Sequence, residues 1–163
     1  MTDRDTAFAE YFAARSDAIR GTAFLLCGDW HRAEDMLQTA LVKLYVAWPR
    51  LHRDGREEAY ARQVILRTSI DEHRRAWNRE RPTDELPELS TAERTSVEDR
   101  DELITALQQL PPMQRSAVVL RHWLGLSVRE TAIELGIAEG SVKSHTSRGL
   151  ERLSALLGEP VEN

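Results

Sequence analysis

The amino-acid sequence predicts an all-α protein, with two small helical domains joined by a flexible acidic linker. Apolar residues recur at spacings of three and four along most of the 163 residues, as they do on one face of a helix. The alternation of apolar and polar residues that is typical of half-buried strands is missing. A stretch at 81–99 holds two prolines and more acidic than basic residues, and it interrupts the helical pattern. We therefore expect domains at 1–80 and 100–158.

Three long helices are expected in the first domain. The first covers residues 5–26 and is followed by a Gly-Asp break. Asp29 would cap the second helix, since its carboxylate can accept hydrogen bonds from the first free N–H groups. Pro49 is expected to end that helix, because proline lacks an N–H and its ring collides with the preceding turn. A third helix is expected at 57–80.

The second domain contains the strongest local signal. Ser127 and Glu130 fit a capping box that opens a helix, and Gly136 is placed to end this helix in a left-handed conformation. A second helix is expected to begin near 139–141. Two short helices with a tight glycine turn between them are typical of a helix-turn-helix.

Composition excludes several classes of protein. No apolar run approaches the ~18 residues of a membrane-spanning helix, and the polar start lacks the pattern of a signal peptide. We therefore expect neither membrane insertion nor conventional secretion. The single Cys27 cannot close an intrachain disulfide, which agrees with a cytoplasmic protein.

Charge is distributed unevenly, although 22 basic and 27 acidic residues give a net charge of −5. Residues 62–81 carry six arginines and three acidic residues, and 140–157 carry three basic residues and one acidic residue. A DNA-binding face needs only local positive potential, so an acidic chain remains compatible with a nucleic-acid partner. The second helix of the helix-turn-helix would expose hydroxyl and basic side chains suited to bases and phosphates. The alternative is a helical hairpin that packs on a partner protein.

Two further segments allow two interpretations each. The basic helix at 67–81 could bind unpaired DNA through arginines and Trp77, or it could be an amphipathic helix with a core tryptophan and internal ion pairs. The segment 34–48 is more apolar than one buried face requires. It could pack entirely in the core, or part of it could dock on helices of another protein.

Three motifs make the sequence recognisable. The first is the pattern from 33 to 41, with the acidic residue Asp35 and with Gln38. The second is a D-x-x-R-R stretch formed by Asp71, Arg74 and Arg75. The third is the long segment LPPMQRSAVVLRHWLGLSVRETAIELGIAEGSVKSHTSRGLERL, which starts at Leu110. Over about 5–156, the chain resembles the extracytoplasmic-function group of bacterial sigma-70-type transcription initiation factors, in its actinobacterial sigma-E-like form. The resemblance implies sigma domain two, a linker toward the polymerase RNA exit path, and sigma domain four.

The resemblance also implies roles for residues of domain two. One helix would dock on the clamp helices of the largest subunit of core RNA polymerase, through Asp35, Gln38, Leu41, Leu44 and Trp48. The last long helix and the loop at 53–57 would engage the promoter minus-ten element and capture a flipped base, since unstacking a base requires a pocket that stabilises it. The residues implied for this contact are Arg53, Asp54, Arg67, Thr68, Asp71, Arg74, Arg75, Trp77 and Asn78.

Domain four would bind the flap of the second-largest polymerase subunit and place its second helix in the major groove of the minus-thirty-five element. The residues implied for the DNA contact are Arg121, Arg129, Ser141, Lys143, Ser144, His145, Ser147 and Arg148. An anti-sigma factor is a further expected partner.

Two other classes of function fit the sequence less well. A stand-alone helix-turn-helix regulator would explain the second domain, but it would leave the basic helix at 67–81 without a role. An enzyme has little support, because the sequence has no glycine-rich phosphate loop, nucleophile elbow or paired metal-ligand motif. We expect no cofactor, no metal site and no catalysis.

Overall fold

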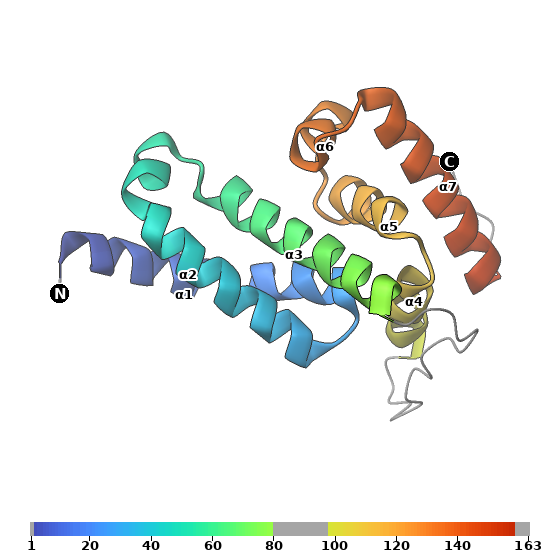
Figure 1. Ribbon diagram of the computed structural model, residues 1–163, viewed down its shortest axis with the longest axis horizontal. Coiled ribbons are helices and arrows are strands. Elements are labelled where there is room, and N and C mark those ends of the chain that lie inside the picture. Colours follow the sequence, from blue (N-terminus) through green and yellow to red (C-terminus); the bar gives the residue numbers. More distant parts are fainter. Residues whose placement is uncertain (1, 80–97, 159–163) are drawn as a thin grey trace. The chain divides into compact units, whose positions relative to one another are not determined.

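The computed structural model of the protein describes residues 2–79 and 98–158, without the side chains of 76–79 and 98–100. Every regular element in these ranges is helical (Figure 1), so the predicted all-α fold is confirmed. The linker predicted at 81–99 lies outside the described residues, except for its last two positions, which open α4. The side chains of Trp77 and Asn78 also lie outside the description.

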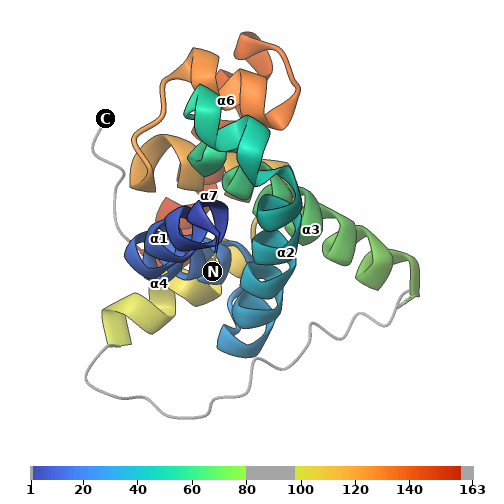
Figure 2. The ribbon, with the colours of Figure 1, turned by 90° about the vertical axis from the view of Figure 1, so that its left-hand side faces the viewer.

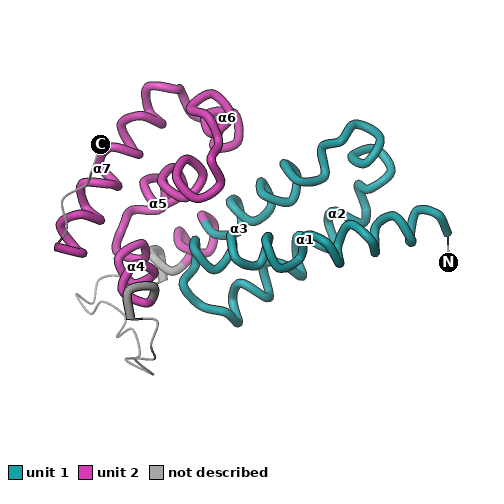
Figure 3. Tube along the Cα trace, turned by 180° about the vertical axis from the view of Figure 1, so that it is seen from behind, with its two compact units in different colours: residues 1–69 teal, residues 70–163 magenta. Residues whose placement is uncertain are grey.

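The chain divides into two compact units, Met1–Ser69 and Ile70–Asn163 (Figure 3). The boundary falls within α3, a continuous helix from Glu57 to Arg79. In the described residues, no helix is long and apolar enough to cross a membrane.

Unit 1 begins with two long helices of equal length. α1 spans Asp3–Cys27 and ends at Gly28, whose φ of 74° is left-handed. α2 spans Trp30–Asp54, and the carboxylate of Asp29 accepts the Arg32 N–H at 3.0 Å, as predicted for this cap. Figures 1 and 2 show the two helices lying against each other beyond the short turn.

The expected end of the second helix at Pro49 is wrong, because α2 continues through the proline to Asp54. Buried side chains on both sides of it, Trp48 and Leu51, hold the segment in the core of unit 1. Proline lacks the N–H that would bond to the carbonyl four residues earlier, which belongs to Tyr45. Arg4 of α1 donates to that carbonyl instead. The missing helical hydrogen bond is therefore replaced by a tertiary one.

Aromatic packing joins α1 to the second half of α2. Phe8 meets the ring of Trp48 edge-on, with 5.4 Å between centroids, and Tyr11 lies 5.3 Å from the same ring. The first turn of α3 is tied to α1 through Glu58, which accepts from the Tyr11 hydroxyl at 2.6 Å and from the Arg15 guanidinium. Unit 1 is thus closed by one aromatic cluster and by polar links between side chains of different helices.

Unit 2 is built from short helices around α7. In chain order they are α4 (Glu98–Gln108), α5 (Pro112–Val118), the π-helix η1 (Val119–Trp123), α6 (Val128–Leu135) and α7 (Glu139–Leu157). The segment Val119–Trp123, which directly continues α5, is widened into a π-helix. At its end, the N–H of the capping residue Leu124 donates to the carbonyl of Val119. The Arg121 guanidinium donates to the carbonyl of Leu126, which follows the element.

A buried arginine closes the end of α4. Arg115 is 5% exposed, and its guanidinium donates to the backbone carbonyls of Leu107, Gln108 and Leu110, at 2.8, 3.2 and 3.0 Å. The last carbonyls of a helix have no partner within it, so a buried end needs donors from elsewhere. Arg115 supplies several donors from one side chain, which the apolar spacing did not predict.

The helix-turn-helix has the predicted boundaries. The Ser127 hydroxyl accepts the Glu130 N–H, and the Glu130 carboxylate accepts the Ser127 N–H, both at 3.0 Å, so the capping box is confirmed. Gly136 ends α6 with a φ of 66°, as expected for a left-handed cap. Gly149 in α7 has a different role: a Cβ atom there would lie 2.6 Å from a methyl group of Val118, so α7 needs glycine to approach α5 closely.

Candidate nucleic-acid and polymerase interfaces

The two sides of α7 differ in burial and in chemistry. Positions 142, 146, 149 and 153 are buried and follow the spacing of one helical face. The opposite side exposes Lys143, Ser144, Ser147 and Arg148. α7 therefore presents a row of hydroxyl and cationic side chains of the kind that donates to guanine edges and phosphate oxygens.

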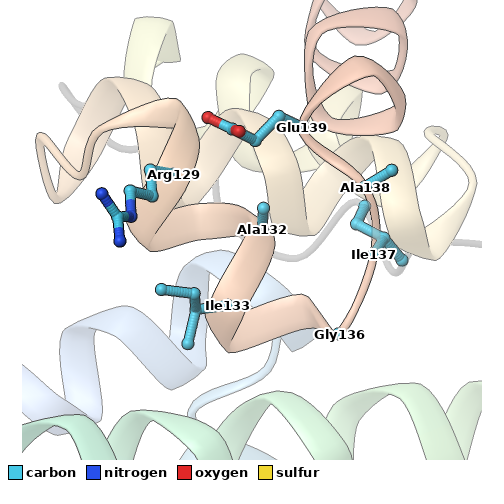
Figure 4. Close-up of a pocket in the computed structure, with 7 residues that line it drawn as sticks. All are labelled: Arg129, Ala132, Ile133, Gly136, Ile137, Ala138 and Glu139. Carbon is cyan, nitrogen blue, oxygen red and sulfur yellow. The ribbon is translucent and has the colours of Figure 1, made fainter.

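The start of α7 lies beside a shallow groove. The groove has a volume of about 560 Å³ and is lined by α6, the glycine turn and the beginning of α7 (Figure 4). Arg129 and Glu139 are its charged lining residues, and the rest of the lining is small or apolar. The N-cap of α7 is Ala138, which has no side chain able to accept a hydrogen bond from the first turn. The N–H groups of that turn are consequently available to an external acceptor such as a phosphate.

Three other predicted residues of unit 2 are less exposed. Ser141 is half-buried. His145 is half-buried as well, and its Nδ1 atom is buried without a hydrogen-bond partner. Arg121 is half-buried and donates to the carbonyl of Leu126 at 2.5 Å, so part of its hydrogen-bonding capacity is used inside the unit.

The predicted minus-ten residues lie mostly along α3. Four of them are exposed: Arg67, Asp71, Arg74 and Arg75. The last three follow Arg67 by four, seven and eight positions, so all four lie near one side of the helix. Thr68 is half-buried, and its hydroxyl donates to the carbonyl of Val64 at 2.7 Å. Of this set, three arginines thus remain exposed on one helix.

The predicted base-capturing loop is shorter than expected, because α2 includes Arg53 and Asp54. Their side chains are 75% and 48% exposed, and a distance of 3.7 Å separates the Arg53 Nε atom from the Asp54 carboxylate. Gly55, with a φ of 67°, then turns the chain toward α3. These two side chains consequently project from the end of a helix.

The predicted polymerase-docking residues of α2 divide into two groups. Asp35 and Gln38 are exposed, and Leu41 is half-buried. Leu44 and Trp48 are each 2% exposed and belong to the core of unit 1. In this structure those two side chains hold α2 in place from inside and offer no surface to a partner.

The second half of α2 exposes three apolar residues that were not among the predicted docking residues. Val42, Tyr45 and Val46 are 63%, 39% and 73% exposed. A signal for them existed, because the buried stripe at 33, 36, 37, 40, 44 and 48 leaves 42 and 46 on another side of the helix. An apolar residue off the buried stripe is a candidate for contact with a partner. We call Asp35, Gln38, Val42, Tyr45 and Val46 the docking face.

A polar chain lies at one end of the docking face. Arg20 of α1 donates to the Glu34 carboxylate at 2.6 Å, and the Gln38 amide donates to the same carboxylate at 3.4 Å. The hydrogen bond from Arg20 lowers the pKa of Glu34, so this carboxylate stays ionised. No group of His, Cys, Asp and Glu side chains able to hold a metal ion occurs within 2–79 and 98–158.

The comparisons with known proteins agree for both parts of the chain. The family model of Sigma-70 region 2 matches residues 12–79, and that of Sigma-70, region 4 matches residues 100–153. The RNA polymerase sigma-E factor of Streptomyces avermitilis is 42% identical over 147 residues, which cover 90% of this chain and 82% of that protein. The ECF RNA polymerase sigma factor SigM of Mycobacterium tuberculosis is 32% identical over 154 residues, covering 93% of this chain and 78% of that protein.

A solved structure extends the likeness to the fold. The sigma factor RpoE from Bartonella quintana, in complex with the anti-sigma factor NepR, superposes with a TM-score of 0.74 and 25% identity, over 93% of this chain and 97% of that chain. Matches to both sigma regions disfavour the stand-alone regulator, which needs only the helix-turn-helix. The chain belongs to the extracytoplasmic-function group of the sigma-70 family and is an alternative RNA polymerase sigma factor, which binds core polymerase and directs promoter recognition and opening.

Proposed function

We propose that this sigma factor contacts promoter DNA at two places with two separate helices and has no catalysis of its own. Residues 1–80 would form sigma domain two, 81–99 the linker and 100–158 sigma domain four. The observation that carries the proposal is the two-sided character of α7. Its buried side is fixed by Val142 and Leu153, while Lys143 and Arg148 stand exposed on the other. A helix with this arrangement fits the major groove of the minus-thirty-five element.

The minus-ten contact is assigned to α3 and the end of α2. Arg67, Arg74 and Arg75 are exposed cations on one helix and suit the phosphates of the melted strand. Arg53 and Asp54 are exposed where the chain turns into α3, and they would meet an extruded base. Trp77 and Asn78 stay in the proposed set on the strength of the sequence alone.

Core polymerase would bind the docking face of α2. Asp35 and Gln38 offer polar groups at one end, and Val42, Tyr45 and Val46 offer apolar area at the other. An apolar patch with a polar margin is the usual composition of a protein interface. The partner surface would be the clamp helices of the largest subunit, and domain four would meet the flap of the second-largest subunit.

An anti-sigma factor is proposed as a second protein partner. The similar RpoE from Bartonella quintana was solved in complex with the anti-sigma factor NepR, which supports a comparable inhibitor for this chain. A partner that covered the docking face would compete with polymerase. The proposed place of action is the cytoplasm, where polymerase and chromosome meet.

Run-off transcription with purified core polymerase tests this function. The unmodified protein should start transcription from a subset of a promoter library. Lys143→Ala with Arg148→Ala should weaken upstream binding by ~1–3 kcal/mol for each base that is no longer hydrogen-bonded. The control is Arg152→Ala, which removes an exposed cation from the second half of the same helix and should have a smaller effect. Arg74→Ala with Arg75→Ala should impair opening. Absence of core binding at micromolar concentration would contradict the proposal.

A further inference from the structure

The start of α1 contacts one residue of the docking face, Tyr45, in several ways. The carboxylate of Asp5 accepts a hydrogen bond from the Tyr45 hydroxyl, with 2.6 Å between the oxygens. The Arg4 guanidinium carbon lies 4.6 Å from the centroid of the Tyr45 ring, within range of a cation–π interaction. Phe8 meets the same ring edge-on at 5.1 Å. The hydroxyl and the ring of Tyr45 are therefore both held from α1.

The backbone of Tyr45 is held from the same turn. Pro49 cannot donate to the Tyr45 carbonyl, so this oxygen lacks its helical partner. Arg4 donates to it and simultaneously covers the ring. Arg4 thus has two roles. It replaces the hydrogen bond that Pro49 cannot donate to the Tyr45 carbonyl, and it restrains the Tyr45 ring.

Among the apolar residues of the docking face, Tyr45 is the one whose side chain gains most from being held by α1. Its neighbours Val42 and Val46 are β-branched, so their own geometry already restricts χ1. Tyr45 is 39% exposed and has no such internal restriction. Without α1, its ring would sample several rotamers at the centre of a surface that a partner must match.

Asp5 acts from a fixed position. The same carboxylate accepts the Thr2 N–H at 3.4 Å, and the Thr2 hydroxyl accepts the Asp5 N–H at 3.2 Å, in the capping box that starts α1. The hydrogen bond from Tyr45 lowers the pKa of Asp5, so the acceptor is ionised at neutral pH. The support of Tyr45 is consequently built into the start of a helix.

We propose that Arg4 and Asp5 are positioning residues for polymerase docking, which hold the Tyr45 ring in the orientation that contacts core polymerase. The inference rests on the proposed docking role of α2. A side chain ordered before binding loses less conformational entropy when the complex forms, and tyrosine is enriched among residues that dominate binding energy. Exposed polar contacts of this kind contribute little to folding stability. The loss of these contacts should therefore appear as a lower affinity for core polymerase.

The test measures the affinity of the full-length protein for core polymerase. Tyr45→Phe, Asp5→Ala and Arg4→Met should each weaken binding about two- to tenfold, the range expected for immobilising one side chain. Tyr45→Phe combined with Asp5→Ala should bind no more weakly than either single variant, because both remove the same hydrogen bond. Binding to minus-thirty-five duplex DNA should not change in any of these variants. Tyr45→Phe leaves the capping box and the Arg4 contact intact, so it should not change thermal unfolding either.

The matched control is Tyr11→Phe. It removes a hydrogen bond of the same kind and length, from Tyr11 to Glu58 at 2.6 Å, between α1 and α3. Core affinity should not change in this variant. Two results would overturn the inference, provided that the wild-type protein bound core polymerase. One is equal weakening by Tyr11→Phe; the other is unchanged affinity in Tyr45→Phe, Asp5→Ala and Arg4→Met alike. Failure of the wild-type protein itself to bind core would instead overturn the proposed function.

Discussion

The two units secure their helices with different kinds of polar contact. In unit 1, most of the polar links join side chains of different helices, as Arg15 binds Glu58 and Arg20 binds Glu34, and these pairs are partly exposed. The contact of Arg4 with the Tyr45 carbonyl is an exception. In unit 2, arginine side chains bind backbone carbonyls, and Arg115 does so while buried. Exposed ion pairs respond to pH and salt, whereas buried donors to carbonyls respond mainly to substitution. Unit 1 should therefore be the more sensitive to pH and salt.

Arg115→Met should give the largest effect, because it removes three hydrogen bonds that one buried guanidinium donates to backbone carbonyls, while keeping most of the side-chain volume. We expect unit 2 to lose about 3 kcal/mol of its free energy of unfolding. Hydrogen exchange of α4 and α5 peptides measures this directly. Arg152→Met, at an exposed position, should leave the exchange unchanged. A loss below about 1 kcal/mol would remove the proposed contrast between the units.

Gly149→Ala sharpens the comparison by testing packing in unit 2 without any change of charge. The new Cβ would lie 2.6 Å from the Val118 methyl group and 3.3 Å from the Gln114 carbonyl oxygen. Overpacking should outweigh the better helix propensity of alanine, for a net loss of about 1–2 kcal/mol in thermal unfolding. Gly140→Ala is the matched control in the same helix, since a Cβ there has nothing within 4 Å. Destabilisation of both variants alike would contradict the packing explanation.

Acid should give the smallest effect, and it should affect unit 1. Glu58 is partly buried, but the hydrogen bonds from Arg15 and Tyr11 outweigh this and hold its pKa below the usual 4.5. A carboxylate with a lowered pKa in the folded state stabilises fully above its unfolded value, and this contribution is lost as pH falls through the folded value. Because the carboxylate is 33% exposed, the loss should stay under about 1 kcal/mol.

Urea unfolding of unit 1, followed by hydrogen exchange between neutral pH and pH values below 4.5, measures the acid effect. Glu58→Gln should flatten the pH dependence of unit 1 and leave that of unit 2 alone. At the alkaline end, burial and the bond to Glu58 raise the pKa of Tyr11 above its usual 10, so stability should fall again as pH rises beyond that value. An equal acid response in both units would contradict the comparison.

Local signals in the sequence predicted what local chemistry determines. The caps at Asp29, Ser127 and Gly136 depend on residues within four positions of one another, and all three were confirmed. The exposed row on α7 followed from the same short-range pattern. The sigma fold itself was recognised from motifs that cover nearly the whole chain.

Long-range contacts account for what the sequence did not predict. Where α2 passes through Pro49, the carbonyl that loses its helical partner is bound by Arg4, which lies 41 positions away. Burial of Leu44 and Trp48 depends on aromatic residues of α1. The widening of η1 likewise has no signature in apolar spacing, because a π-turn shifts the helical register by one residue.

The uninterrupted course of α2 has a mechanical consequence. Asp35 near its start and Arg53 near its end stand about 27 Å apart on a single rod, at 1.5 Å of rise per residue. If the helix ended at Pro49, the segment with Asp35 and the segment with Arg53 could change their orientations independently. With the helix intact, a tilt imposed on α2 at the proposed docking face would be transmitted to Arg53 and Asp54, the proposed contacts of the extruded base. Binding to core polymerase and contact with the melted DNA strand would then be coupled through one rigid helix.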